Sequence, residues 1–166
     1  MGMSSSRSSA SQTTLTPNIT VKKSEEEWRA CLTPKQFAVL RRGATDPRGS
    51  GEYDSHYPTE PGVYVCAGCS APLYEGKHKF DCGCGWPGFW SCIAQAVYER
   101  VDADGSRRVE ILCNACGGHL GHVFRGEGFS NPPPNERHCV NSTSIKWVPT
   151  SKSTNSGVAG APSKFQ

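Results

Sequence analysis

Long apolar runs and concentrated charge are both missing from this sequence. No stretch of 18 apolar residues occurs in its 166 residues, so no membrane-spanning helix is expected. No charged start followed by an apolar segment is present, which argues against a secretory signal. The 18 Lys and Arg residues nearly balance the 15 Asp and Glu residues and are scattered, whereas a nucleic-acid-binding domain would gather its basic residues in a patch. We therefore expect neither a membrane nor a nucleic acid as partner.

Cysteine, glycine and proline are abundant instead. Nine cysteines without a secretory signal favour metal binding or redox chemistry over a disulfide scaffold. The 18 glycines and 12 prolines indicate many turns, and the hydrophobic fraction of 36% allows a modest core. This combination predicts a single, mainly β domain rather than a helix bundle.

Composition divides the chain into three parts. Residues 1–23 are rich in Ser and Thr and contain no acidic residue, which predicts a disordered tail. An ordered domain is expected over residues 24–149, followed by a second disordered tail of small and polar residues over 150–166. We expect a cytoplasmic protein. The alternative is a mitochondrial one, in which the N-terminal tail serves as a transit peptide.

Two short helices are predicted at the start of the domain. Ser24 and Glu27 have the spacing of a capping box, in which side chain and backbone satisfy each other's hydrogen bonds. Thr33 and Gln36 repeat the pattern, and Gly43 marks the end of the second helix. Neither helix carries plausible chemistry, so we expect both to cover one end of the core.

Short strands follow, separated by turns. Alternating apolar residues and flanking turn residues predict strands over 62–66, 97–101, 107–113, 119–124 and 142–148. Residues 102–106 (DADGS) are expected to form the turn that joins two of them.

Two C-x-x-C pairs give the strongest local signal in the chain. Each pair can aim two thiolates at one point, and two pairs make the closed four-sulfur site typical of structural zinc. The gap of 43 residues between the pairs means that the metal would close a long loop. The alternatives are two redox dithiols or two structural disulfides. The proposed ligands are Cys66, Cys69, Cys113 and Cys116.

The segment 137–142 (RHCVNS) holds a cysteine outside any such pair. Cys139 lies two residues after Arg137 and two before Asn141. A neighbouring cation favours the thiolate, which is the reactive form of cysteine, so Cys139 is a candidate nucleophile. The alternative is a buried structural thiol.

A glycine-dense loop over residues 80–89 holds two further thiols, Cys82 and Cys84. A mobile thiol near a reactive one is what a resolving cysteine requires. Trp86 and Phe89 offer an apolar wall beside them. The alternative is a packed turn with incidental thiols.

Two histidines, His119 and His122, lie three positions apart. In a regular strand they would face opposite sides, but a bulge at Gly121 would bring them to one side. There they would be able to transfer protons near neutral pH. The alternative is a pair of structural histidines.

Taken in order, these motifs resemble the B-type methionine sulfoxide reductases, which are specific for methionine-R-sulfoxide. The resemblance covers residues 24–148, and five segments carry it: 51–53, 63–69, 83–87, 113–124 and 137–142. Each alone would be weak, but five in the same order are not expected by chance. The resemblance implies mainly antiparallel sheets forming a small barrel-like, zinc-bound core with short N-terminal helices.

The resemblance also implies roles for individual residues. Cys139 would be the catalytic nucleophile and Cys84 the resolving cysteine, while the two C-x-x-C pairs would hold one structural Zn²⁺. The sulfoxide pocket would be shaped by Trp86, His119, His122, Phe124 and Asn141, beside Arg137. Many family members have Ser where this chain has Cys82, and Ser or Ala where it has Gly88. Cys82 is therefore a second candidate for resolution, and Cys31 and Cys92 match no role.

The implied mechanism is thiol redox catalysis. Cys139 would attack the sulfoxide sulfur, His122 rather than His119 would help protonate the departing oxygen, and methionine would leave behind a sulfenic acid. Cys84 would then form a disulfide with Cys139, which thioredoxin would reduce. The expected substrates are oxidised proteins, with free methionine sulfoxide as an alternative, and a monomer is expected.

Two other functions stay open on the residues alone. A zinc-ribbon binding module would explain the four paired cysteines but gives Cys84 and Cys139 no task. A cysteine hydrolase would use Cys139, a histidine and Asn141, and would need no external dithiol.

Overall fold

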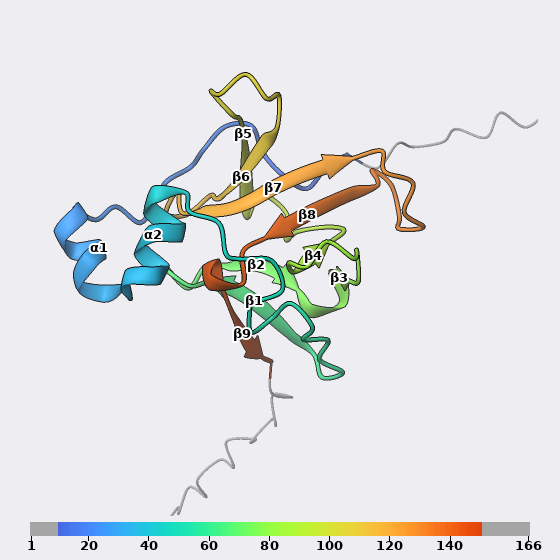
Figure 1. Cartoon of the computed structure of the whole chain (residues 1–166), viewed down its shortest axis with the longest axis horizontal. Coiled ribbons are helices and arrows are strands. Elements are labelled where there is room, and N and C mark those ends of the chain that lie inside the picture. Colours follow the sequence, from blue (N-terminus) through green and yellow to red (C-terminus); the bar gives the residue numbers. More distant parts are fainter. Residues whose placement is uncertain (1–9, 151–166) are drawn as a thin grey trace, which may run out of the picture.

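The structure, a computed structural model, describes residues 10–150. Two antiparallel sheets and two short α-helices make up this part of the chain (Figure 1). The prediction of a mainly β fold with N-terminal helices is confirmed. Both sheets are open, so within residues 10–150 the barrel-like core is not a closed barrel. In the same range no helix is long and apolar enough to cross a membrane.

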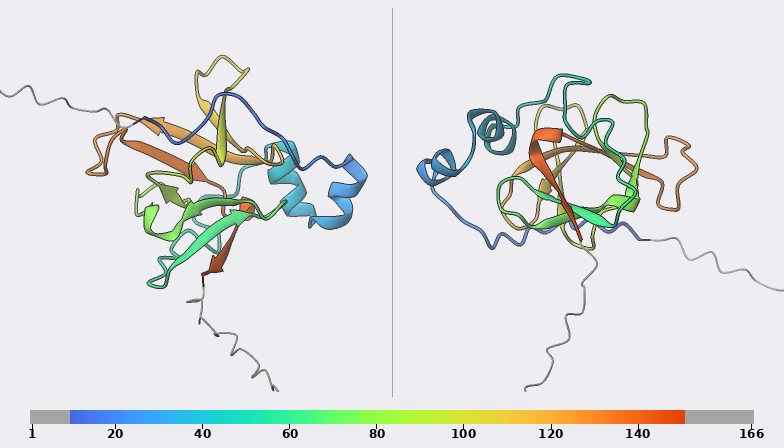
Figure 2. Two further views of the ribbon diagram at one scale, coloured as in Figure 1. Left: turned by 180° about the vertical axis from the view of Figure 1, so that it is seen from behind. Right: turned by 90° about the horizontal axis from the view of Figure 1, so that it is seen from below.

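Both helices begin at their capping signals, and α2 also ends at one. α1 (Glu25–Cys31) starts after Ser24 and α2 (Pro34–Arg42) after Thr33, and both predicted capping boxes are present. Gly43 ends α2 in the left-handed conformation, which glycine adopts without strain. The helices lie together at one end of the sheets, as we expected (Figures 1 and 2).

The larger sheet has six strands in the order β3-β4-β8-β7-β6-β5. The bounds are Lys79–Phe80 for β3, Gly88–Phe89 for β4, Glu136–Val140 for β8, His119–Arg125 for β7, Val109–Cys113 for β6 and Val97–Val101 for β5. The predicted strands over 97–101, 107–113 and 119–124 are therefore present, and residues 102–106 turn between β5 and β6. The sequence patterns did not predict β3, β4 or β8.

The smaller sheet has three strands in the order β2-β1-β9. β1 spans Gly62–Cys66, β2 spans Pro72–Glu75, and the short 3₁₀ helix η1 (Gly76–His78) leads from β2 to β3. The strand predicted over 142–148 is wrong at its start. Residues 142–144 form a 3₁₀ helix, η2 (Ser142–Ser144), because the Ser144 amide donates to the Asn141 carbonyl, and β9 (Ile145–Pro149) begins only after it.

Aromatic side chains join the two sheets. Tyr74 of β2 stacks on Phe89 of β4 with ring centroids 4.2 Å apart, and Tyr64 of β1 meets the same ring edge-on at 5.2 Å. All three rings are fully buried. The short strand β4 is thus fixed in place by the smaller sheet, which matters because β4 lies beside the strand that carries Cys139.

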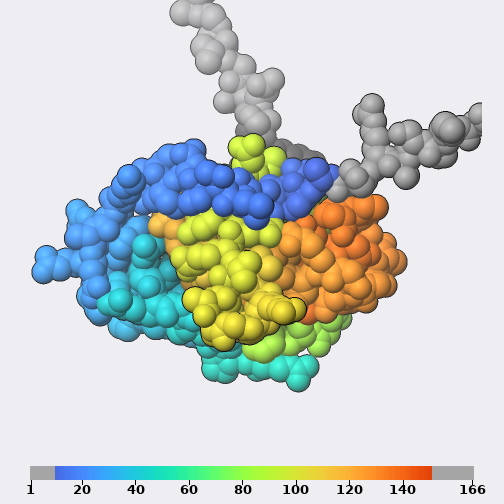
Figure 3. All heavy atoms as spheres, turned by 90° about the horizontal axis from the view of Figure 1, so that it is seen from above, coloured from blue at the N-terminus to red at the C-terminus, as the bar shows by residue number. Residues whose placement is uncertain are grey.

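Residues 10–23 correct the prediction of disorder. This segment lies across β5 and the turn that follows β6 (Figure 3). The Thr14 amide donates to Val97 at 3.0 Å, the Glu99 amide donates to Thr14 at 2.9 Å, and the Val21 amide donates to Ala115 at 2.8 Å. The segment has few apolar side chains, but the open edge of β5 offers backbone groups that it can pair with. Residues 1–9 and 151–166, where the tails were predicted, lie outside the described residues.

Candidate active site

Cys139 lies near the end of β8, which runs between β4 and β7. Its register partner in β4 is Gly88 and its partner in β7 is His122. Paired residues of antiparallel strands point to the same face of a sheet, so Cys139 and His122 share a face. The Cys139 side chain is half-buried, which excludes the alternative of a thiol sealed in the core.

Gly121 allows β7 and β8 to approach closely at this point. A Cβ on Gly121 would lie 1.8 Å from the carbonyl oxygen of Cys139, far inside van der Waals contact. Only glycine fits there, and the residue therefore fixes the backbone that presents the thiol.

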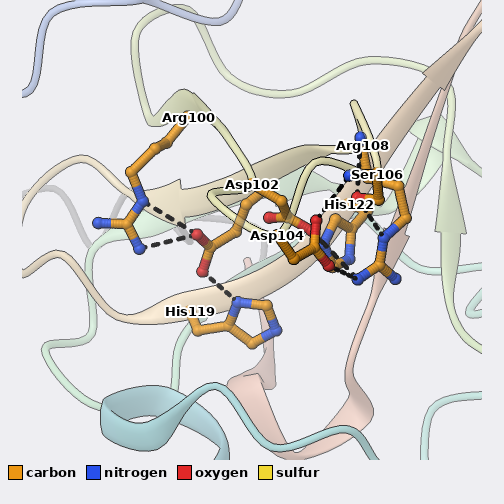
Figure 4. Close-up of polar contacts among 8 residues, drawn as sticks. Arg100, Asp102, Asp104, Ser106, Arg108, His119 and His122 are labelled. Atoms are coloured by element: carbon orange, nitrogen blue, oxygen red, sulfur yellow. Dashed lines mark hydrogen bonds and ion pairs between the residues drawn. The ribbon is translucent and has the colours of Figure 1, made fainter.

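Both histidines point to one side, as the sequence predicted. The register between β6 and β7 shifts by one residue at Leu112, a bulge that places His119 on the same face as His122. Their ring centroids are 5.9 Å apart (Figure 4). The bulge therefore brings the two histidines to one face, which the regular alternation of a strand would not do.

Each histidine is oriented by a carboxylate that the sequence analysis missed. His119 Nδ1 lies 2.6 Å from Glu110, which also binds Arg100, and His122 Nε2 lies 3.0 Å from Asp102, which also binds Arg108 (Figure 4). The carboxylate–arginine distances are 2.7 Å and 3.1 Å. Glu110 is the register partner of His122. It lies on the polar side of the strand predicted over residues 107–113, so the alternating pattern of that strand already pointed to it.

A pocket of about 240 Å³ connects these groups. All five residues predicted to shape a sulfoxide pocket line it, and Arg137 does not. The lining includes Trp86, His119, His122, Phe124, Cys139 and Asn141.

Trp86 and Asn141 are both held by the buried residue Asp46. The Trp86 indole N–H donates to the Asp46 carbonyl at 2.9 Å, and the Asn141 side-chain oxygen accepts from the Asp46 amide at 2.8 Å. The Asn141 amide group also donates to the Leu120 carbonyl at 3.0 Å. These bonds hold the pocket wall. They also weaken the hydrolase alternative, which would need Asn141 to orient a histidine.

Arg137 lies beside the pocket rather than in it. Its guanidinium sits 4.3 Å from the centroid of the Phe124 ring and pairs with Glu127 at 2.7 Å. Arg137 and Cys139 are two positions apart on β8 and therefore point to the same face. The guanidinium charge acts on the Cys139 thiol, in the direction of a lower pKa.

Three sulfurs form a cluster at this face. Cys84 Sγ lies 3.9 Å from Cys139 Sγ and 2.8 Å from Cys82 Sγ. The Arg48 guanidinium donates to the Cys84 carbonyl at 3.0 Å, and the Gly49 amide donates to Gly85 at 2.8 Å. The loop that the sequence marked as mobile is therefore tied to a neighbouring segment.

The hydrogen bonds in this cluster shift the pKa values of the three thiols in different directions. Hydrogen bonds from Cys139 and then Cys82 lower the pKa of Cys84 to about 2. The pKa of Cys139 is raised, first because its thiol donates to Cys84 and then because it is buried. The pKa of Cys82 is also raised, because its own thiol forms a hydrogen bond with Cys84. A Cys139 thiolate therefore forms when its proton moves to Cys84.

His138 takes no part in this face. Its side chain is fully buried on the other side of β8, where Nδ1 lies 3.0 Å from the Tyr74 hydroxyl and Nε2 lies 3.0 Å from Glu136. Glu136 also pairs with Arg125 at 2.9 Å. This buried network fixes β8 from behind.

The four paired cysteines come together where β1 and β6 end. Their sulfurs all lie within 4.8 Å of one another, with 3.7 Å between Cys66 and Cys116 and 3.6 Å between Cys69 and Cys113. Four sulfurs on a tetrahedron about 2.3 Å from a metal would lie about 3.8 Å apart. The donor set therefore fits a tetrahedral ion, and the four cysteines lie close enough to bind one.

The two C-x-x-C turns have the same backbone. Each turn ends on a residue with a left-handed backbone, Ser70 in the first and Gly117 in the second. The Ser70 amide donates to the Cys66 carbonyl, and the Gly117 amide donates to the Cys113 carbonyl. Trp28 and Leu40 of the helices pack beside the first turn. The helices thus shield the cysteine cluster from water.

Comparison of the sequence with known proteins identifies its family. The family model of the SelR domain matches residues 32–149, a span that contains all seven clustered sulfurs. This chain belongs to the SelR-domain family.

Relatives of this SelR-domain protein occur in plants. It is 57% identical over 129 residues to peptide methionine sulfoxide reductase B5 of Oryza sativa subsp. japonica, covering 78% of this chain and 92% of the relative. It is 52% identical over 136 residues to peptide methionine sulfoxide reductase B5 of Arabidopsis thaliana, covering 82% and 95%. With the chloroplastic peptide methionine sulfoxide reductase B3 of rice it shares 56% identity over 132 residues, and the match spans only 56% of that relative's length.

Proposed function

We propose that this chain is a peptide-methionine (R)-S-oxide reductase, which reduces methionine-R-sulfoxide to methionine. One observation carries the proposal: a half-buried thiol with a second sulfur 3.9 Å away opens onto a pocket with two histidines and a tryptophan. The names of the relatives point to the same reaction. Such an enzyme repairs proteins under oxidative stress, because methionine sulfoxide disrupts cores and interfaces.

In the first step Cys139 acts as the nucleophile. Its proton moves to Cys84, and the resulting thiolate attacks the sulfoxide sulfur. The charge of Arg137 favours that thiolate, since it opposes the burial that raises the Cys139 pKa.

The sulfoxide oxygen needs a proton as its bond to sulfur breaks. His122 is the proposed donor because it shares the face of Cys139 in register, and His119 lies next to it. Asp102 and Glu110 orient the two rings through their contacts with the ring nitrogens. Methionine leaves, and Cys139 is left as a sulfenic acid.

Resolution follows within the sulfur cluster. Cys84, which holds the proton taken from Cys139, attacks the sulfenic sulfur. That proton leaves with the hydroxyl group as water, and a Cys84–Cys139 disulfide forms. An external dithiol then reduces the disulfide, and thioredoxin is the proposed partner.

The pocket would recognise the methyl end of the substrate by apolar contact. The Trp86 ring would hold the terminal methyl group, with Phe124 as a second apolar wall. Because Asp46 fixes both Trp86 and Asn141, the pocket is preorganised.

One zinc ion is the proposed occupant of the four-cysteine cluster. Four thiolates leave no open position, so the ion would be structural. It would link β1, which ends at Cys66, to β6, which ends at Cys113, and would close a long loop of the chain.

We also propose that the protein acts as a monomer in the cytoplasm on oxidised proteins. Imaging of a tagged full chain tests the compartment, and sedimentation tests the oligomeric state. A mitochondrial signal would support the alternative location.

A turnover assay with separated epimers tests the function. The protein with thioredoxin should form methionine from a peptide carrying the R sulfoxide and none from the S sulfoxide. Absence of methionine from the R epimer, in a protein whose Cys139 still reacts with iodoacetamide, would overturn the proposal.

A further inference from the structure

A third thiol, that of Cys82, lies next to Cys84 and Cys139 and has no role in the proposed catalytic cycle. Cys82 Sγ lies 2.8 Å from Cys84 Sγ, closer than Cys139 Sγ at 3.9 Å. A disulfide bond is about 2.05 Å long, so little movement separates Cys82 and Cys84 from a bond. Gly83 between them is left-handed, with φ of +70°, and a Cβ there would meet nothing within 4 Å.

The space for the Cys82 sulfur exists only because residue 88 is glycine. A Cβ on Gly88 would lie 2.6 Å from Cys82 Sγ and 3.2 Å from the Phe80 carbonyl oxygen. Positions 82 and 88 of this loop are thus in direct steric contact. The sulfur of Cys82 fills the volume that a side chain at 88 would take.

We propose that Cys82 is a second resolving cysteine, which takes the disulfide from Cys139 and leaves it on the loop as Cys82–Cys84. This inference rests on the proposed reductase function, because the reaction with sulfoxide supplies the first disulfide.

The exchange balances without any further reactant. The Cys82 thiolate attacks Cys84 Sγ, a Cys82–Cys84 bond forms, and the Cys84–Cys139 bond breaks. The proton lost by Cys82 is matched by the one that Cys139 takes up as its thiolate leaves. Two electrons stay within the cluster, Cys139 is reduced again, and the substrate pocket is free for another sulfoxide.

The position of the loop suits this task. Cys82 and Cys84 are half-buried, and both Asp81 and Gly83 beside them are exposed. Cys139, in contrast, opens onto the substrate pocket. Moving the disulfide to the loop separates the surface that meets the external dithiol from the pocket that meets the sulfoxide.

Counting methionine without any reductant tests the relay. The fully reduced full-length protein, given an excess of peptide methionine-R-sulfoxide, should form about two methionines per chain, because Cys139 is regenerated once. Cys82→Ser should form about one, because its disulfide stays on Cys139. Cys31→Ser, which alters an exposed thiol in α1, is the matched control and should still give the wild-type number.

Peptide mapping locates the disulfide independently. Trypsin places Cys82, Cys84 and the buried Cys92 on peptide 80–100 and Cys139 on peptide 138–146, and fragmentation of peptide 80–100 shows which two of its cysteines are joined. In the wild type we expect a disulfide inside peptide 80–100, and a dimedone-labelled sulfenic acid on peptide 138–146. In Cys82→Ser we expect the two peptides to be cross-linked to each other.

Gly88→Ala provides a second variant that keeps all three thiols. The added methyl should displace the Cys82 sulfur, so the second methionine should be lost while the first is kept. One methionine from the wild type, with the disulfide still joining the two peptides, would overturn the relay. No methionine at all would instead overturn the reductase function on which it rests.

Discussion

Cys84 Sγ lies 3.9 Å from Cys139 Sγ although the two residues are 55 positions apart in the chain. The register of β4 with β8 produces this proximity, because Gly88 pairs with Cys139 and the loop before β4 folds back over it. Oxidation of one sulfur can therefore be followed by bonding to the other without a large movement.

Removing the nucleophile should abolish turnover. Cys139→Ser is expected to lower the rate of methionine formation by at least about 10³-fold, because a hydroxyl is a far weaker nucleophile than a thiolate. Methionine formation with thioredoxin, followed by chromatography, measures this. Cys31→Ser should keep full activity, and residual turnover in Cys139→Ser would show that another thiol reacts.

The Cys139 pKa should respond in opposite directions to two substitutions. Cys84→Ser is expected to lower it, because the hydrogen bond to the Cys84 thiolate is the main cause that raises it. Arg137→Gln is expected to raise it, because the favourable charge is lost. The pH dependence of iodoacetamide alkylation, read on peptide 138–146, gives the pKa. Shifts of the same sign would contradict these two causes of the Cys139 pKa shift.

Gly121→Ala should damage the strand that presents Cys139. The methyl would collide with the Cys139 carbonyl oxygen, and we expect a loss of about 2–4 kcal/mol in the free energy of unfolding. Gly68→Ala is the control, because its methyl would make only ordinary contacts at 3.4 Å or more. Urea unfolding compares the two variants, and equal losses would rule out the steric explanation.

Metal removal should unfold the protein rather than only inactivate it. A chelator or Cys69→Ser is expected to lower the free energy of unfolding by several kcal/mol, because the ion would link β1 to β6. Elemental analysis should find about one zinc per chain in the wild type. A metal-free protein with an unchanged melting temperature would contradict a structural ion.

The buried carboxyl group of Glu136 should make the free energy of unfolding depend on pH. Burial alone would raise its pKa, but hydrogen bonds from His138 and Arg125 lower it to about 2, from an ordinary 4.5. A lowered pKa in the folded state stabilises the fold above pH about 4.5, and this contribution, on the order of 3 kcal/mol, is lost as the pH falls toward 2.

The comparison with Glu136→Gln isolates this effect. The difference in free energy of unfolding between the wild type and Glu136→Gln should be largest above pH 4.5 and shrink as the pH falls toward 2. Glu60→Gln, at an exposed position, should show no such change. A difference that does not vary with pH would mean that the buried carboxylate is not ionised.

Local signals predicted the helices and the cysteine turns correctly. A capping box or a C-x-x-C turn is closed by residues three or four positions apart, so its geometry is contained in a few neighbouring residues. The strands that alternate apolar and polar residues, such as β5 and β6, were found for the same reason.

β8 was missed although it carries Cys139. Its buried face is formed by Glu136, His138 and Val140, so two of the three inward residues are polar and the strand lacks an apolar face. They are tolerated because Tyr74 and Arg125 satisfy them from other strands. A pattern based on hydrophobicity cannot recognise a strand whose core contacts are hydrogen bonds to distant residues.

The sequence by itself determined which thiols pair as C-x-x-C turns, where the helices begin and which cysteine stands apart. Only the tertiary structure decided that Cys82, Cys84 and Cys139 meet, that Glu110 and Asp102 hold the two histidines, and that Gly88 makes room for a sulfur. These contacts join residues far apart in the chain, and strand register, which pairs backbone groups across the whole sheet, brings them together.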